Sequence, residues 1–131
     1  KALSSANGWN STTNSGAPGN NQSLNNYLGF SANPFGEQSD AYGDSAVFYT
    51  STQRDIYYAF AMRISYNSNS VDRYIPYKFF NLSVRCIRDS GNSNMYAYDY
   101  DGNFYTAVTI GTQTWLVQNL GCNHYRNGDL I

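Results

Sequence analysis

Apolar and polar residues alternate most clearly at residues 80–89, Phe-Asn-Leu-Ser-Val-Arg-Cys-Ile-Arg-Asp. One side of this period of two holds Leu82, Val84 and Cys86. The other side holds Ser83, Arg85 and Ile87. A period of two is typical of a strand that buries one face, so we expect this segment to be the core strand of the fold.

Three further strands are predicted before it, at residues 46–52, 56–66 and 71–77. In the second of them, the side expected to face the core carries Ile56, Tyr58, Phe60, Met62, Ile64 and Tyr66. The outward side carries Tyr57, Ala59, Ala61, Arg63 and Ser65. Pro76 cannot donate to a strand ladder, which predicts an edge or bulged strand at 71–77.

Polar linkers and turns separate the remaining elements. Residues 1–39 show no period, which predicts a long coil whose scattered aromatic residues pack onto a sheet. Residues 90–95 are predicted to be a linker. Strands at 95–100 and 104–110 then flank Asp101-Gly102, a sequence typical of a type I′ hairpin, and a short strand is predicted at 114–117.

The composition agrees with a mainly β fold with long irregular loops. The 131 residues include 13 Tyr and 11 Gly, with many Asn and Ser, and the net charge is −1. This charge gives no field that would attract nucleic acid, and no apolar run is long enough for a membrane helix. We expect one extracellular or cell-surface domain without a secretion signal in this chain.

Few residues offer catalytic or metal chemistry. His124 is the only histidine, so no nucleophile has an obvious base, and we expect no enzyme and no cofactor. Asp99, Asp101 and Asn103 begin like a calcium loop, but Phe104 and Ile110 occupy the positions of its required Gly and Glu, which predicts a hairpin turn and no metal site. For the two cysteines, Cys86 and Cys122, a disulfide and two separate thiols both remain open.

Several segments fit one known pattern. Its middle is matched at residues 1–11 and 29–34. Its aromatic-Ser-Ser-Thr strand is matched by Phe-Tyr-Thr-Ser-Thr at 48–52, and its closing strand by Leu-Ser-Val-Arg-Cys-Ile-Arg-Asp at 82–89. Its opening is matched by Asp-Tyr-Asp-Gly-Asn-Phe-Tyr at 99–105, and by residues 110–115, 118–120 and 124–129. On these motifs the chain resembles the Fibrobacter succinogenes major paralogous domain over nearly its whole length.

The resemblance implies a C-type-lectin-like fold, a twisted antiparallel sheet carrying long loops. The order departs from the family: residues 1–89 resemble the closing half (loops 1–39, display strands 40–81, closing strand 82–89) and residues 96–131 the opening half. The helical segment that normally lies between the opening half and the closing half of the family is missing. Residues 31–36 stand where the family usually has a Leu-Pro-Gly-Gly-like segment. The chain is therefore expected to be a permuted or partial domain.

A relationship to formylglycine-generating enzymes is the enzymatic alternative, because residues 81–86 also resemble the last strand of that family. That chemistry relies on a separate pair of reactive cysteines outside this strand, and only Cys122 remains. We therefore favour a non-catalytic module.

Relatives of the family display ligand-binding residues before the closing strand, here about 40–81. Tyr, Ser and Asn, the residues of antibody-like paratopes, are abundant there, which favours a protein or glycan ligand. An ordinary polar sheet face is the alternative interpretation. The predicted ligand-binding residues are Tyr57, Arg63, Ser65, Asn67, Asn69, Asp72, Arg73, Tyr74 and Tyr77.

A second hypothesis is a structural subunit of a bacterial surface filament or array. A chain made of two half-domains could complete its fold with strands of a neighbouring copy. Under either hypothesis we expect no nucleic-acid partner and no membrane insertion.

Overall fold

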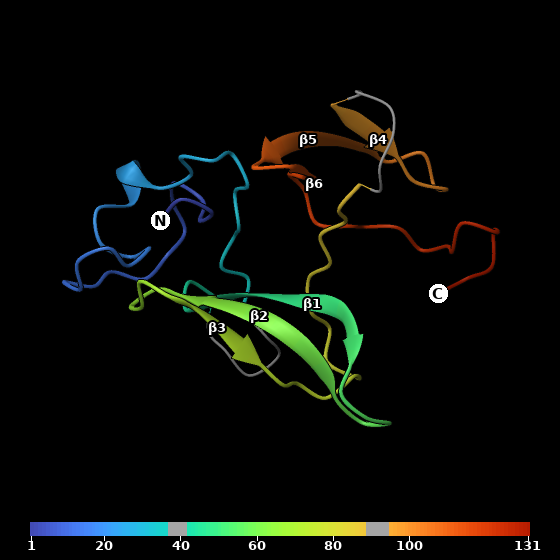
Figure 1. The fold of residues 1–131 in the computed structure, drawn as a ribbon, viewed down its shortest axis with the longest axis horizontal. Helices are drawn as coiled ribbons and strands as arrows, with labels where there is room; N and C mark the ends of the chain where they lie inside the picture. Colours follow the sequence, from blue (N-terminus) through green and yellow to red (C-terminus); the bar gives the residue numbers. More distant parts are fainter. Residues whose placement is uncertain (37–41, 89–94) are drawn as a thin grey trace. The chain divides into compact units, whose positions relative to one another are not determined.

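The computed structural model describes residues 1–36, 42–88 and 95–131, and the chain divides into two compact units, Lys1–Val84 (unit 1) and Arg85–Ile131 (unit 2). The predicted linker, except Met95, and residues 40 and 41 of the predicted display region lie outside the described residues. The fold is mainly β, as predicted, with one antiparallel three-stranded sheet in each unit (Figure 1). A single 3-10 turn, η1 (Gln22–Leu24), is the one helical element of the described chain.

The sheet of unit 1 has the order β1 (Ser45–Gln53), β2 (Ala59–Ser65) and β3 (Val71–Tyr74), which confirms the three predicted strands with shorter ends for two of them. The first four residues of β1 are buried, so this strand lies at the centre of the core. Around it the core gathers the buried apolar side chains Trp9, Ala17, Phe30, Ala32, Ala46, Val47, Phe48, Ala59, Ala61 and Ile64.

The long N-terminal coil packs onto this sheet through part of its aromatic residues, as predicted. The ring of Phe30 meets that of Phe48 in β1 edge to face, 5.7 Å between centroids. Trp9 is also buried, and its Nε1 donates to the backbone oxygen of Ser5 at 3.2 Å. Tyr27, 86% exposed, takes no part in this core.

The predicted separation of β2 into a core face and an outward face was wrong. Ala59 and Ala61, expected outside, are buried, and Met62, expected inside, is 39% exposed. Four consecutive residues of β1 are buried, whereas β3 has no buried residue, so burial decreases across the sheet from β1 to β3. Alternation predicted the strand correctly but could not predict which neighbours cover each side.

The predicted core strand at 80–89 was also wrong as a continuous element. Ser83 forms an isolated parallel bridge with Phe48, and Ile87 forms an isolated antiparallel bridge with Trp115. The expected burial is reversed here, because Val84 is 38% exposed and Arg85 is buried. The chain passes from one unit to the other between these two residues.

The sheet of unit 2 has the order β4 (Tyr96–Tyr98), β5 (Phe104–Ile110) and β6 (Gln113–Leu116), which confirms the predicted hairpin and short strand. The predicted type I′ turn was wrong: it requires positive φ at both Asp101 and Gly102, and of these two residues only Gly102 has it, with φ 82°. Gly102 N donates to Asp99 O at 3.2 Å, so Tyr100 and Asp101 are the central residues of the turn.

Unit 2 has almost no core of its own. Among its described residues only Arg85, Tyr105 and Thr114 are buried, and Tyr105 is the only hydrophobic one.

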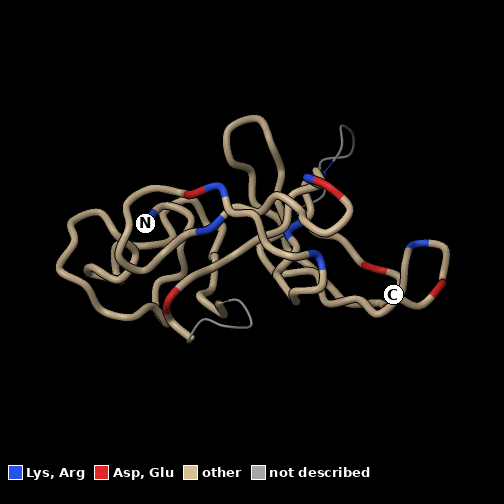
Figure 2. The backbone as a smooth tube through the Cα atoms, turned by 90° about the horizontal axis from the view of Figure 1, so that it is seen from below, with Lys and Arg blue, Asp and Glu red and all other residues tan. Residues whose placement is uncertain are grey.

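Most residues of the chain carry no charge, and the charged residues of both signs are interspersed along it (Figure 2).

Candidate functional site

The predicted ligand-binding residues of β2 and β3 divide between the two faces of the sheet. Arg63 pairs directly with Asp72, and Ala61 with Tyr74, so these side chains share one face. Arg73 pairs with Met62 on the opposite face. Ser65 lies on the Arg63 face, because two residues along a strand return to the same side.

Aromatic rings support the two arginines on their separate faces. The guanidinium of Arg63 lies 4.9 Å from the ring centroid of Tyr74, and that of Arg73 lies 5.5 Å from that of Phe60. Arg63 Nε is buried without a hydrogen-bond partner among the described residues. Both arginines are therefore held by ring contacts, but they do not form one surface.

Asn67 and Asn69 lie in the turn between β2 and β3. Asn14 Nδ2 donates to the backbone oxygen of Asn67 at 2.8 Å. A Cβ on Gly16 would lie 3.3 Å from Cβ of Asn69, so the N-terminal coil runs close to this turn. The amide side chains of the turn are exposed, beyond one end of the sheet.

Tyr57 and Tyr77 lie together beyond the other end of β2. Lys78 N donates to Tyr57 O at 2.9 Å, and Tyr58 and Tyr77 form an isolated antiparallel bridge. The side chains of Tyr57 and Tyr77 are 65% and 41% exposed. Of the nine predicted residues, Tyr77 belongs to an exposed group of aromatic rings, and Tyr57 lies next to Tyr58 of the same group.

That surface is a contiguous group of four rings, which we call the Tyr77 cluster: Tyr58, Tyr77, Phe79 and Phe80. Tyr77 is at its centre, 4.4 Å from Tyr58 and stacked on Phe79 at 5.0 Å, centroid to centroid. Phe80 meets both Tyr77 and Phe79 edge to face. Phe79 is 70% exposed, so the stack presents a ring to solvent.

Hydrogen bonds fix the backbone of the cluster. The hydroxyl of Tyr49 in β1 donates to Tyr77 O at 2.8 Å and lies 3.0 Å from Phe80 O. Lys78 Nζ donates to Gln53 Oε1 at 2.7 Å, and a shallow pocket of about 260 Å³ lies beside it, lined by Tyr49, Gln53 and Lys78 among others. These hydrogen bonds thus fix the backbone that carries the rings, next to the shallow pocket.

The electrostatics of the cluster come from short-range hydrogen bonds. Asp55 Oδ1 accepts from the backbone N–H groups of Tyr57 and Tyr58, each at 2.8 Å, and the bond from Tyr57 is the main cause of the lowered pKa of Asp55. The hydrogen bond with Tyr77 raises the pKa of Tyr58. The guanidinium of Arg54 lies 5.7 Å from the Tyr58 ring. A carboxylate and a cation therefore border the rings.

Sequence reasoning missed three members of this cluster. The predicted alternation assigns Tyr58 to the core, and Phe80 begins the predicted core strand at 80–89, so neither is among the predicted ligand-binding residues, and nor is Phe79. The run Tyr-Lys-Phe-Phe at 77–80 has too little alternation for a buried strand, and that density of rings is the signal that could have identified it.

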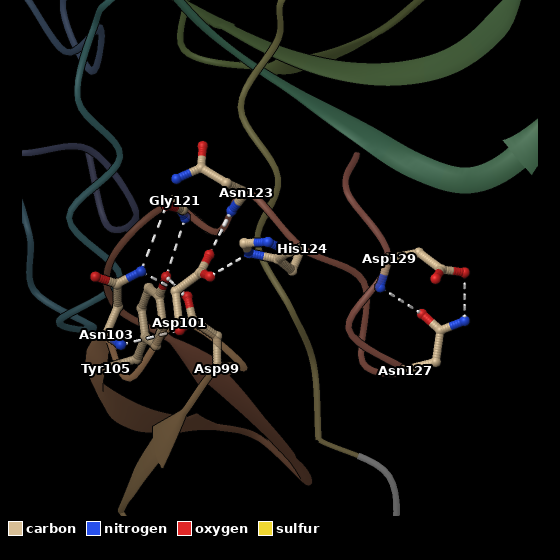
Figure 3. Close-up of polar contacts among 9 residues, drawn as sticks. All are labelled: Asp99, Asp101, Asn103, Tyr105, Gly121, Asn123, His124, Asn127 and Asp129. Carbon is tan, nitrogen blue, oxygen red and sulfur yellow. Dashed lines mark hydrogen bonds and ion pairs between the residues drawn. The ribbon is translucent and has the colours of Figure 1, made fainter.

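Unit 2 carries a polar network around the β4–β5 turn (Figure 3). Asp99 accepts from Asn103 N at 2.9 Å, from Asn103 Nδ2 at 2.8 Å and from the Tyr105 hydroxyl at 2.7 Å. Asp101 accepts from Asn123 N, and its other oxygen lies 2.5 Å from His124 Nδ1. Protein donors thus occupy both carboxylates.

A metal does not suit this network. Among the residues that the structure describes, no group of three or more His, Cys, Asp or Glu side chains could hold a metal ion. The arrangement instead ties the hairpin turn to the segment around Asn123, which agrees with the prediction of a turn.

A cavity with a volume of about 580 Å³ lies in unit 2. The sheet contributes Tyr105, Ala107 and Leu116 to its wall. Cys86 and Cys122 also line it, both as free, half-buried thiols.

Comparison of the chain with protein-family models, curated proteins and solved structures returned no match. Among the described residues, no helix is long and apolar enough to cross a membrane.

Proposed function

We propose that this chain is a non-catalytic binding module of the cell surface or the extracellular space, which holds a protein or glycan ligand against the Tyr77 cluster. The observation that carries the proposal is the exposed stack of Tyr77 on Phe79, whose backbone is held by the hydrogen bond from the Tyr49 hydroxyl to Tyr77 O. Rigid aromatic side chains give a large contact area at a small entropic cost, and exposed groups of them mark interaction sites.

The surroundings of the cluster suit a ligand with polar groups as well as apolar faces. The exposed pair Arg54 and Asp55 lies beside Tyr58, and Lys78 lies beside the shallow pocket. A sugar ring could stack its C–H face on Phe79 while its hydroxyls meet these polar groups. The resemblance of the chain to a family with a C-type-lectin-like fold supports this proposal.

The same resemblance supports a C-type-lectin-like fold for the chain. An experimental structure that cannot be superposed on half of a C-type-lectin-like domain would contradict this proposed fold.

The function is tested with the double variant Tyr77→Ser, Phe79→Ser, using labelled protein on an array of immobilised oligosaccharides and on intact cells. We expect at least about a tenfold loss of binding, because exposed aromatic anchors dominate interface energies. Tyr27→Ser is the matched control, since Tyr27 is an exposed tyrosine of the same unit. Equal binding by the double variant and the wild type would contradict the proposal.

The structural subunit remains the second candidate, and the sparse core of unit 2 favours it. A neighbouring copy could cover the open sheet face of a unit in which Tyr105 is the only buried hydrophobic residue among those described. Light scattering over a dilution series would then show a mass that rises with concentration. A monomer mass that does not change with concentration would rule this candidate out.

A further inference from the structure

Both cysteines of the chain belong to the unit that lacks a core. Unit 1 has none, whereas Cys86 and Cys122 line the same cavity of unit 2. Both are half-buried and free. Small domains that cannot bury enough apolar surface are usually held by disulfides or metals, and the described residues offer no metal site.

Hydrogen bonds anchor the backbone at or beside each cysteine within the same unit. Cys86 O accepts from Leu116 N at 3.0 Å, which holds this residue against β6. Gly121 N donates to the Tyr105 hydroxyl at 3.0 Å, and Asn123 N donates to Asp101, so both neighbours of Cys122 are tied to the β4–β5 hairpin. Both thiols are therefore presented from anchored segments to one cavity.

We propose that Cys86 and Cys122 form an intramolecular disulfide that staples unit 2. The oxidant is a small-molecule disulfide such as oxidised glutathione. One cysteine thiolate attacks it and forms a mixed disulfide, and the second thiolate then displaces glutathione. In total, two thiols lose two protons and two electrons, and one oxidised glutathione becomes two reduced ones.

The closed loop would contain all three strands of the unit, β4, β5 and β6. In the chain-entropy model, a loop of this length shifts the unfolding equilibrium toward the folded state by roughly 100- to 1000-fold. Burial, and to a smaller extent Cys122, raise the pKa of Cys86, so its thiolate is scarce at neutral pH. We therefore expect faster exchange in mildly alkaline buffer. This inference does not depend on the ligand proposed for unit 1.

The test incubates the full chain with excess oxidised glutathione and measures its intact mass. We expect the loss of two hydrogens without added glutathione, and a peptide map that links the segments of Cys86 and Cys122. Cys86→Ser and Cys122→Ser should each gain one glutathione instead. Two adducts, two unmodified thiols, or disulfide-linked dimers in the wild type would overturn the proposal.

Amide hydrogen exchange then measures the effect of the staple within the same sample. Protection of the β5 and β6 amides should rise by roughly 100- to 1000-fold after oxidation, whereas the β1 and β2 amides of unit 1 provide an internal control that should not change. A disulfide that forms but leaves exchange in β5 unaltered would overturn the stapling role.

Discussion

Arg85 shows how strongly one side chain can depart from its local pattern. Alternation placed it on the exposed side of a strand, yet it is 7% exposed. Its Nε donates to Asn119 Oδ1 at 2.6 Å and its Nη1 to Leu116 O at 3.0 Å. A buried guanidinium is tolerated when its donors are satisfied, and both of these acceptors come from residues more than thirty positions away in sequence. The sequence pattern contains no signal for such partners.

Replacing Arg85 by Ala should destabilise unit 2. Burial lowers the pKa of Arg85 to about 10, so the group is still charged at neutral pH and its hydrogen bonds are charge-assisted. Their loss leaves half-buried acceptors unpaired and should cost about 2–4 kcal/mol in the free energy of unfolding. Urea denaturation followed by circular dichroism measures this value.

Arg126→Ala is the matched control for that experiment. Arg126 belongs to the same unit and is exposed, so its removal should change the free energy of unfolding by less than about 0.5 kcal/mol. Equal effects of the two substitutions would show that the hydrogen bonds of Arg85 contribute nothing to stability.

The β4–β5 hairpin is held to the segment after β6 by its turn. Hydrogen bonds from Asn123 N and then His124 lower the pKa of Asp101. For Asp99, desolvation acts in the opposite direction, but hydrogen bonds from Asn103 and Tyr105 still lower its pKa. A carboxyl group whose pKa is lower in the folded state stabilises that state fully above its unfolded pKa, near 4, and loses the effect as the pH falls through the folded value.

Acid should therefore loosen this turn below about pH 4. An NMR titration of the Asn103 and Asn123 amides measures the two carboxylates separately, because Asn103 N binds Asp99 and Asn123 N binds Asp101. In Asp101→Asn, the acid transition of the Asn123 amide should disappear and that of Asn103 should persist. An unchanged Asn123 titration in this variant would contradict the assignment.

Strand positions were predictable from sequence, but strand partners were not. The run Ala-Val-Phe-Tyr-Thr-Ser-Thr at 46–52 predicted β1, and the Asp-Gly turn between two strand-like segments predicted the β4–β5 hairpin, because both signals are local. Residues 80–88 have the clearest alternation of the chain but form only isolated bridges, from Ser83 to Phe48 and from Ile87 to Trp115. Whether an extended segment joins a sheet depends on distant partners.

At the scale of the whole molecule, the candidate site was predicted only in part. The abundance of Tyr and Asn predicts a ligand surface in unit 1 that includes Tyr57 and Tyr77, and the side chains of both are exposed. Arg63 and Arg73 were expected on one surface and lie on opposite faces of the sheet. Composition gives the kind of surface, whereas register and the path of the chain after β3 decide which residues meet.

The division of the chain is also a property of tertiary contacts. The composition changes most clearly at residues 90–95, whereas the contacts divide the chain between Val84 and Arg85, within a segment whose alternation gives no sign of a boundary. Among the described residues, unit 1 has ten buried hydrophobic residues besides the buried prolines Pro18, Pro34 and Pro76, and unit 2 has one, Tyr105. Only the packed structure reveals this asymmetry.

The two tryptophans of the chain fall one in each unit, and this gives the molecule a natural pair of optical reporters. Trp9 is a buried indole whose Nε1 is bonded to Ser5, and Trp115 is half-buried on β6. Phenylalanine at either position leaves a single indole fluorophore. The emission of Trp115→Phe then reports the state of unit 1 through Trp9, and the emission of Trp9→Phe reports the state of unit 2 through Trp115. Neither measurement needs an added label.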